Sequence, residues 1–141
     1  MKALVKKRAR ITRVRSAQHL LAASAAASAE AQVVHLESNA AKLASLRDSL
    51  TVSSGTTTGA VLQNRGELAQ RLDKARDGLA TAIVSARAAA ELKVAERLEA
   101  RQRQESAAKL DARAVQALAD WTESRMNAAF RPKILKQKGN Y

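Results

Sequence analysis

The sequence predicts an all-α fold, a long antiparallel two-helix coiled-coil hairpin with a projecting C-terminal helix. Three observations lead to this prediction: the composition, the rarity of turn residues and the spacing of apolar residues. The 141 residues include 32 alanines, five glycines and one proline, and only 33 larger apolar side chains. That volume is too small for a globular core of this length, whereas abundant Ala, Leu, Arg and Glu are typical of long helices with narrow contacts. One elongated domain over residues 1–141 is expected.

The first helix is predicted over about residues 3–50. Four leucines and one asparagine follow one another there at steps of three and four, the heptad pattern of a coiled coil: Leu36, Asn39, Leu43, Leu46 and Leu50. We call such a row, which faces the other helix, a seam. Asn39 within the seam either fixes the register or points to solvent. Residues 22–29 are only Ala and Ser, so the helices can approach closely there but bury little surface.

A connection is predicted over residues 51–59, where two glycines and a run of Ser and Thr disfavour helix. The second helix is predicted over about residues 60–131, with Pro132 at its end and a basic tail over residues 132–141. Its seam also has heptad spacing, in Leu68, Leu72, Ala75, Leu79, Ala82 and Ala86.

A turn centred near Gly55 pairs residues whose numbers sum to about 110, so Leu43 is expected level with Leu68 and Leu36 level with Ala75. Beyond about residue 108 the second helix then has no partner within the chain. An apolar stripe in that part is a candidate partner-binding surface, formed by Leu110, Ala114, Ala117, Leu118 and Trp121. The alternative is that a bent first helix or the tail covers Trp121.

The net charge of +12 is concentrated at the two ends of the chain. The middle holds all 13 acidic residues and 14 basic residues, so it is nearly neutral. The basic ends contain no acid and consist of Lys2, Lys6, Lys7, Arg8, Arg10, Arg13 and Arg15 at the N-terminus and Arg131, Lys133, Lys136 and Lys138 at the C-terminus. The predicted register sets Glu96, Glu99 and Glu105 beside the N-terminal arginines, so part of that charge is expected in exposed ion pairs.

The sequence indicates no catalytic residue, no metal site and no cofactor. It has no Cys, two widely spaced histidines, His19 and His35, and no Gly-rich phosphate loop, so we predict that the protein is not an enzyme. No uncharged run reaches the ~20 residues that span a bilayer, which favours a cytoplasmic protein. Residues 1–29 are Arg-rich and free of acids, as in a cleaved targeting segment, and this alternative stays open.

Residues 6–18 (KKRARITRVRSAQ), the small-residue connection, and residues 96–105 (ERLEARQRQE) leading to residues 109–114 (KLDARA) together resemble the FliJ family. Members of this family are small cytoplasmic coiled-coil proteins of the flagellar and related type III export apparatus. The resemblance covers roughly residues 4–125. It implies a central stalk or adaptor at the export ATPase ring that links the ring to the export gate, at the inner face of the cell membrane. Export chaperones are further partners that the resemblance implies.

Other functions stay open beside this one. The basic ends supply phosphate affinity of the kind that binds nucleic acid, although no aromatic residue interleaves with either cluster. Leu4, Ile11 and Val14 share a helix face with basic neighbours, which suits attachment to an anionic membrane surface. The last alternative is a coiled-coil adaptor unrelated to export.

Overall fold

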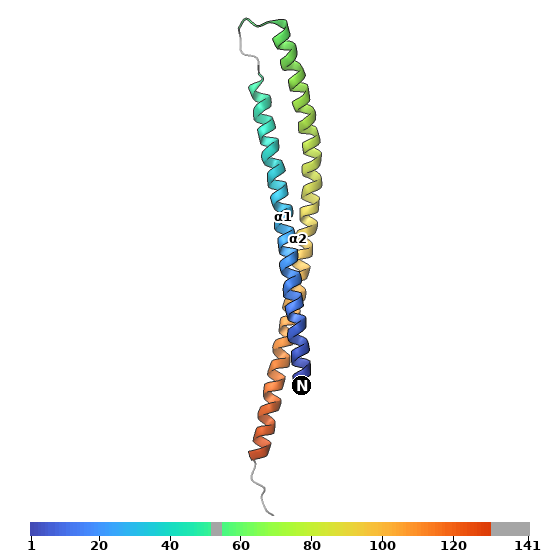
Figure 1. Cartoon of the computed structure of the whole chain (residues 1–141), viewed down its shortest axis with the longest axis vertical. Helices are drawn as coiled ribbons and strands as arrows, with labels where there is room; N and C mark the ends of the chain where they lie inside the picture. The colour runs from blue at the N-terminus through green and yellow to red at the C-terminus, as the bar shows by residue number, and fades with distance from the viewer. Residues whose placement is uncertain (52–54, 131–141) are drawn as a thin grey trace, which may run out of the picture. The chain divides into compact units, whose positions relative to one another are not determined.

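The computed structural model describes residues 1–51 and 55–130, and within these residues it contains two α-helices and no β-strand (Figure 1). Helix α1 is Lys2–Ser49 and helix α2 is Gly59–Phe130. The all-α prediction is confirmed, and each helix begins and ends one residue before its predicted bounds. Residues 52–54 of the connection lie outside the described residues, and so does the basic tail with Arg131, Pro132, Lys133, Lys136 and Lys138.

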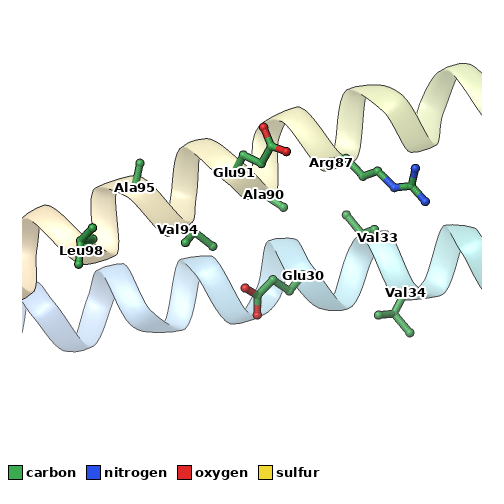
Figure 2. A pocket seen from close by; sticks show the side chains of 9 residues that line it. All are labelled: Glu30, Val33, Val34, Arg87, Ala90, Glu91, Val94, Ala95 and Leu98. Atoms are coloured by element: carbon green, nitrogen blue, oxygen red, sulfur yellow. The ribbon is translucent and has the colours of Figure 1, made fainter.

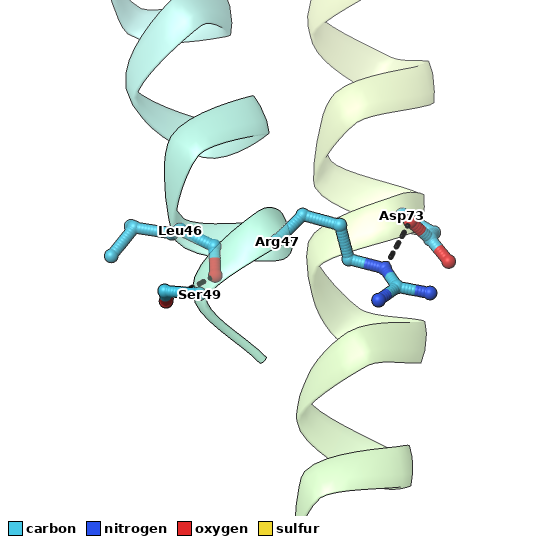
Figure 3. Close-up of polar contacts among 4 residues, drawn as sticks. All are labelled: Leu46, Arg47, Ser49 and Asp73. Carbon is cyan, nitrogen blue, oxygen red and sulfur yellow. Dashed lines mark hydrogen bonds and ion pairs between the residues drawn. The ribbon is translucent and has the colours of Figure 1, made fainter. Parts of the chain in front are cut away.

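Hydroxyl side chains mark the two helix ends that adjoin the connection. At the end of α1, the Oγ of Ser49 donates a hydrogen bond to the carbonyl of Leu46 at 2.7 Å (Figure 3). That carbonyl is one of the last four of the helix, which lack a partner in the helix itself. At the start of α2, the backbone N–H of Val61 donates to the Oγ1 of Thr58 at 3.4 Å, so Thr58 is the N-cap. Gly59, expected in the connection, is therefore the first residue of α2.

The chain forms two compact units, and α1 and α2 each contribute a segment to both. The loop unit is His19–Ala100, which includes the connection between the helices. The terminal unit is Met1–Gln18 together with Arg101–Tyr141. In each unit the half-buried residues of both helices recur at steps of three and four, the spacing of a coiled-coil seam.

In the loop unit, α1 and α2 lie side by side and run in opposite directions (Figure 1). Two exposed ion pairs join them: Arg47 Nε lies 3.1 Å from Asp73 Oδ1 (Figure 3), and Arg87 Nε lies 3.1 Å from Glu37 Oε1. The numbers of these partners sum to 120 and 124. The predicted register, with a sum of about 110, is therefore wrong by about ten residues. Leu68, expected level with Leu43, is 47% exposed.

The burial of large side chains explains the register that the loop unit adopts. When the residue numbers of facing partners sum to about 120, two leucines of α1 and Leu50, just after its end, are level with three large residues of α2. All six are half-buried: Leu36 and Leu43 of α1, Leu50, and Ile83, Leu79 and Leu72 of α2. The predicted register would instead have set Leu36 level with Ala75, which is exposed. A leucine level with another leucine or an isoleucine can remove more apolar area from water than a leucine level with an alanine.

The prediction failed because it assumed that the connection is centred between the helix ends. Residues 59–68 of α2 are all exposed, and this first part of α2 extends past the end of α1 (Figure 1). Nine residues, 50–58, separate the two helices, and a chain of nine residues can reach up to ~30 Å. Asn39 donates to His35 Nε2 of its own helix at 3.4 Å, so it contributes no hydrogen bond to α2 that would fix the register.

Alanine forms the whole of the buried core among the described residues. Ala26 has no exposed surface, and only Ala90 and Ala107 are otherwise buried. A seam of alanines lets two helix backbones approach closely, but it removes little apolar area from water. The stability of each unit therefore rests on a long row of small contacts.

In the terminal unit the seam includes polar residues that contact the other helix. The Oγ1 of Thr12 lies 3.4 Å from the carbonyl of Ala107, and Gln104 Nε2 donates to the Oγ of Ser16 at 3.2 Å. The residue numbers of these two pairs sum to 119 and 120, so the register is the same as in the loop unit. Asp111 Oδ1 is buried without a hydrogen-bond partner among the described residues. Val5 and Leu118 are half-buried in this seam, whereas five other large aliphatic residues of the unit lie outside it and are exposed: Leu4, Ile11, Val14, Leu110 and Val115.

The terminal-unit contacts predict which cysteine pair will form a disulfide. In Thr12→Cys/Ala107→Cys the sulfur of Cys at position 12 replaces an atom already close to the Ala107 backbone, so oxidation should join the pair in most chains. Leu43→Cys/Leu68→Cys, the pair of the other register, should stay reduced. Non-reducing gel electrophoresis followed by mass spectrometry measures both, and the chain contains no other cysteine. Faster oxidation of the second pair would contradict the register.

Candidate functional site

The predicted partner-binding stripe on α2 is divided between two helix faces. Ala114 and Leu118 are half-buried and lie on the face of α2 that carries buried Ala107, which Thr12 of α1 contacts. At a register sum of about 120, the pairing with α1 extends to about residue 118 rather than to residue 108. The expectation that α2 lacks a partner from residue 108 onward is therefore wrong.

The exposed part of the stripe is smaller and contains the only tryptophan of the chain. Leu110, Ala117 and Trp121 are exposed, at steps of seven and four residues that place them on one face of α2. That face lies about 75° around the helix from the seam, at 100° per residue. We call these three residues the Trp121 stripe.

The Trp121 ring is held by its own helix. The guanidinium of Arg125, one turn further along α2, lies 4.9 Å from the centroid of the ring, a cation–π contact. The indole remains 41% exposed, and Met126 and Phe130 near the end of α2 are more exposed still. An accessible tryptophan has the properties of an interface anchor, because a partner can bury its large aromatic ring.

A second apolar surface, which the sequence did not predict, lies in the loop unit (Figure 2). It is an open groove of about 560 Å³ between α1 and α2, lined by Glu30, Val33, Val34, Arg87, Ala90, Glu91, Val94, Ala95 and Leu98. Figure 2 shows Val33 and Val94 pointing toward the space between the helices, where Ala90 leaves room. The groove depends on the register of the helices, so the heptad pattern alone could not locate it.

Two of the acidic residues that the sequence predicted beside the N-terminal arginines, Glu96 and Glu105, pair within α2 instead. Glu105 pairs with Arg101 at 2.9 Å and Glu96 pairs with Lys93 at 3.1 Å, in each case within α2. Arg15 donates to Gln18 Oε1 at 3.0 Å. Within the part of the chain that the structure describes, no ion pair involves Lys2, Lys6, Lys7, Arg8, Arg10, Arg13 or Arg15. These residues, all in α1, therefore form a cationic surface that is not neutralised locally.

The described residues contain no group of three or more His, Cys, Asp or Glu side chains placed to hold a metal ion. The Nδ1 of His19 is buried without a hydrogen-bond partner in that part of the chain, and His35 contacts Asn39. None of the described helices is sufficiently long and apolar to cross a membrane. The candidate binding surfaces among the described residues are the Trp121 stripe, the groove and the basic surface.

No family model, curated protein or solved structure matches the chain. The features that indicate a function are therefore the Trp121 stripe, the groove and the basic surface, together with the residues that resemble the FliJ family.

Proposed function

We propose that the chain is a cytoplasmic, non-catalytic coiled-coil hairpin with a projecting C-terminal helix, which binds at the ring of a flagellar or type III export ATPase. It acts there as a central stalk or adaptor and links the ring to the export gate. The observation that carries the proposal is the Trp121 stripe, an exposed aromatic surface on a helix whose other face already packs on α1.

The register in the terminal unit supports a projecting α2. At a sum of about 120, Lys2 is level with about residue 118, so the last twelve residues of α2 have no counterpart on α1. Twelve helical residues extend ~18 Å. An end of this length, with Trp121 and Phe130 exposed on it, suits insertion into a protein partner better than it suits packing within the chain.

The thin core also supports a role in binding. Because only alanines are buried among the described residues, most large apolar side chains stay accessible. Accessible apolar residues at heptad spacing are the means by which coiled coils recruit further helices. Accessible apolar residues fit a stalk that is held by surrounding subunits, as the FliJ-like segments imply. Apolar side chains provide contacts and no group that could act in catalysis.

The proposal is tested by binding of the full chain to a purified export ATPase. We expect a stable complex with the assembled ring, measured by analytical ultracentrifugation, and no complex with an unrelated hexameric ATPase of similar size and charge. Raising the salt concentration should weaken the complex only modestly, because apolar anchors supply much of its affinity. Equal binding to both rings, or to neither, would contradict the proposal, and the latter result would favour an adaptor unrelated to export.

A further inference from the structure

We infer that the outer face of α1 in the terminal unit binds an anionic phospholipid surface. This outer face is formed by Leu4, Lys7, Arg10, Ile11, Val14 and Arg15. The inference does not depend on the proposed function, because it concerns another helix face and another class of partner.

The outer face is turned away from the contact with α2, with half-buried Arg15 at its edge nearer the seam. The α1 seam in this unit passes through Val5, Ala9, Thr12 and Ser16, of which Thr12 and Ser16 contact α2. At 100° per residue, the centre of the outer face lies about 150° around the helix from that seam. Lys7, Arg10, Ile11, Val14, Arg15 and Gln18 together line one shallow depression, which confirms that they share a face.

The outer face combines an apolar stripe with cations on both sides. Leu4, Ile11 and Val14 are 50%, 38% and 50% exposed. The same helix segment instead turns the polar residues Thr12 and Ser16 toward α2. Arg10 lies on one side of this stripe and Arg15 on the other. A helix of this kind lies in a membrane interface, with its aliphatic residues among the acyl chains and its cations at the headgroups.

Charge complementarity identifies the lipid as anionic. The first acidic residue of the chain is Glu30, so no carboxylate precedes it on α1. The facing segment of α2 in the terminal unit contains Glu105, which already pairs with Arg101, and Asp111, which lies on the seam and forms no ion pair among the described residues. Cations that are not neutralised by the protein are attracted to phosphatidylglycerol or phosphatidylserine headgroups and not to a neutral bilayer.

Two features favour a membrane over other anionic partners. Nucleic acid would contact the cations through phosphates and would leave Leu4, Ile11 and Val14 exposed to water. An acidic partner helix would bury Lys7, which lies within the apolar stripe, at a cost to a coiled coil. At a membrane the long side chain of Lys7 instead extends to the headgroup level while its methylene groups stay in apolar surroundings.

The test measures sedimentation of the full chain with vesicles of phosphatidylcholine mixed with phosphatidylglycerol, or of phosphatidylcholine alone. We expect binding to the mixed vesicles only. Arg10→Gln/Arg15→Gln should weaken this binding about 30-fold, since each cation near an anionic surface contributes about a fivefold factor. The matched control, Arg71→Gln/Lys74→Gln, removes the same charge from exposed positions of α2 in the loop unit and should change binding less than about threefold.

A second pair of variants separates a membrane from nucleic acid. Ile11→Ser/Val14→Ser should weaken vesicle binding about tenfold and leave binding to a DNA duplex unchanged. A single cysteine at Val14 with an environment-sensitive dye should shift to the blue when mixed vesicles are added, whereas a dye at exposed Ser45 should not. Duplex binding tighter than vesicle binding, equal binding to neutral vesicles, or no shift at Val14 would overturn the inference.

Discussion

Ala26→Glu is expected to lower the melting temperature of the helices by more than ~10 °C, a loss of ~3 kcal/mol in the free energy of unfolding. Ala26 has no exposed surface and lies where α1 carries only Ala and Ser. A carboxylate at this position would either be buried without a partner or force the helices apart, and both outcomes remove contacts along the seam. Circular dichroism at 222 nm, recorded against temperature, measures the effect.

Ala25→Glu and Ala27→Glu are matched controls, because they make the same change at neighbouring exposed positions of the same helix. Each should shift the melting temperature by less than ~3 °C, since the only common effect is the small difference in helix propensity between Ala and Glu. An equal loss in all three variants would show that helix propensity, and not burial at Ala26, sets the stability of this segment.

The helices could be predicted from the sequence because the signals for them are local. Heptad spacing in both halves and the Gly, Ser and Thr residues of the connection were enough to place each helix end within one residue. The N-cap at Thr58 was not foreseen, although a Thr before an apolar helical run is a known start signal.

The register could not be predicted in the same way, because it depends on contacts between distant residues. Every heptad seam can pair with another at several offsets, and the offsets differ only in which side chains become level. The observed offset sets Leu36, Leu43 and Leu50 level with large residues of α2, and it is not the offset of a centred connection. Because of the same error, the contact between α1 and α2 was expected to end near residue 108 and not near residue 118. Leu118 was therefore expected to be exposed beside Trp121, whereas it is half-buried in the seam.

The candidate surfaces were predictable to the extent that they depend on one helix. Trp121 and Leu110 are exposed, and the sequence selected both from the apolar stripe. The groove beside Val33 and Val94 joins two helices, so it could be found only when their register was known. The expected ion pairs of Glu96 and Glu105 with N-terminal arginines failed because basic residues within α2, one turn away, take these carboxylates.

Trp121→Ala is expected to weaken binding to the export ATPase ring about 30-fold or more, ~2 kcal/mol, because a buried aromatic anchor contributes most of the energy of an interface. The same variant should leave the melting temperature within ~3 °C of the parent chain, since Trp121 lies outside the seam and its contact with Arg125 is within one helix. Isothermal titration calorimetry with the purified ring measures the first effect, and thermal unfolding measures the second.

Two control variants on the same helix make the result of Trp121→Ala decisive. Val115→Ala removes an exposed apolar side chain from another face of α2 and should change neither ring binding nor stability. Leu118→Ala removes a half-buried seam residue, so it should lower the melting temperature while ring binding by the folded chain is retained. A melting temperature lowered by more than ~5 °C in Trp121→Ala would instead show that the indole packs within the chain. Ring binding would then have to depend on a surface other than the Trp121 stripe, and the groove in the loop unit would be the next surface to test.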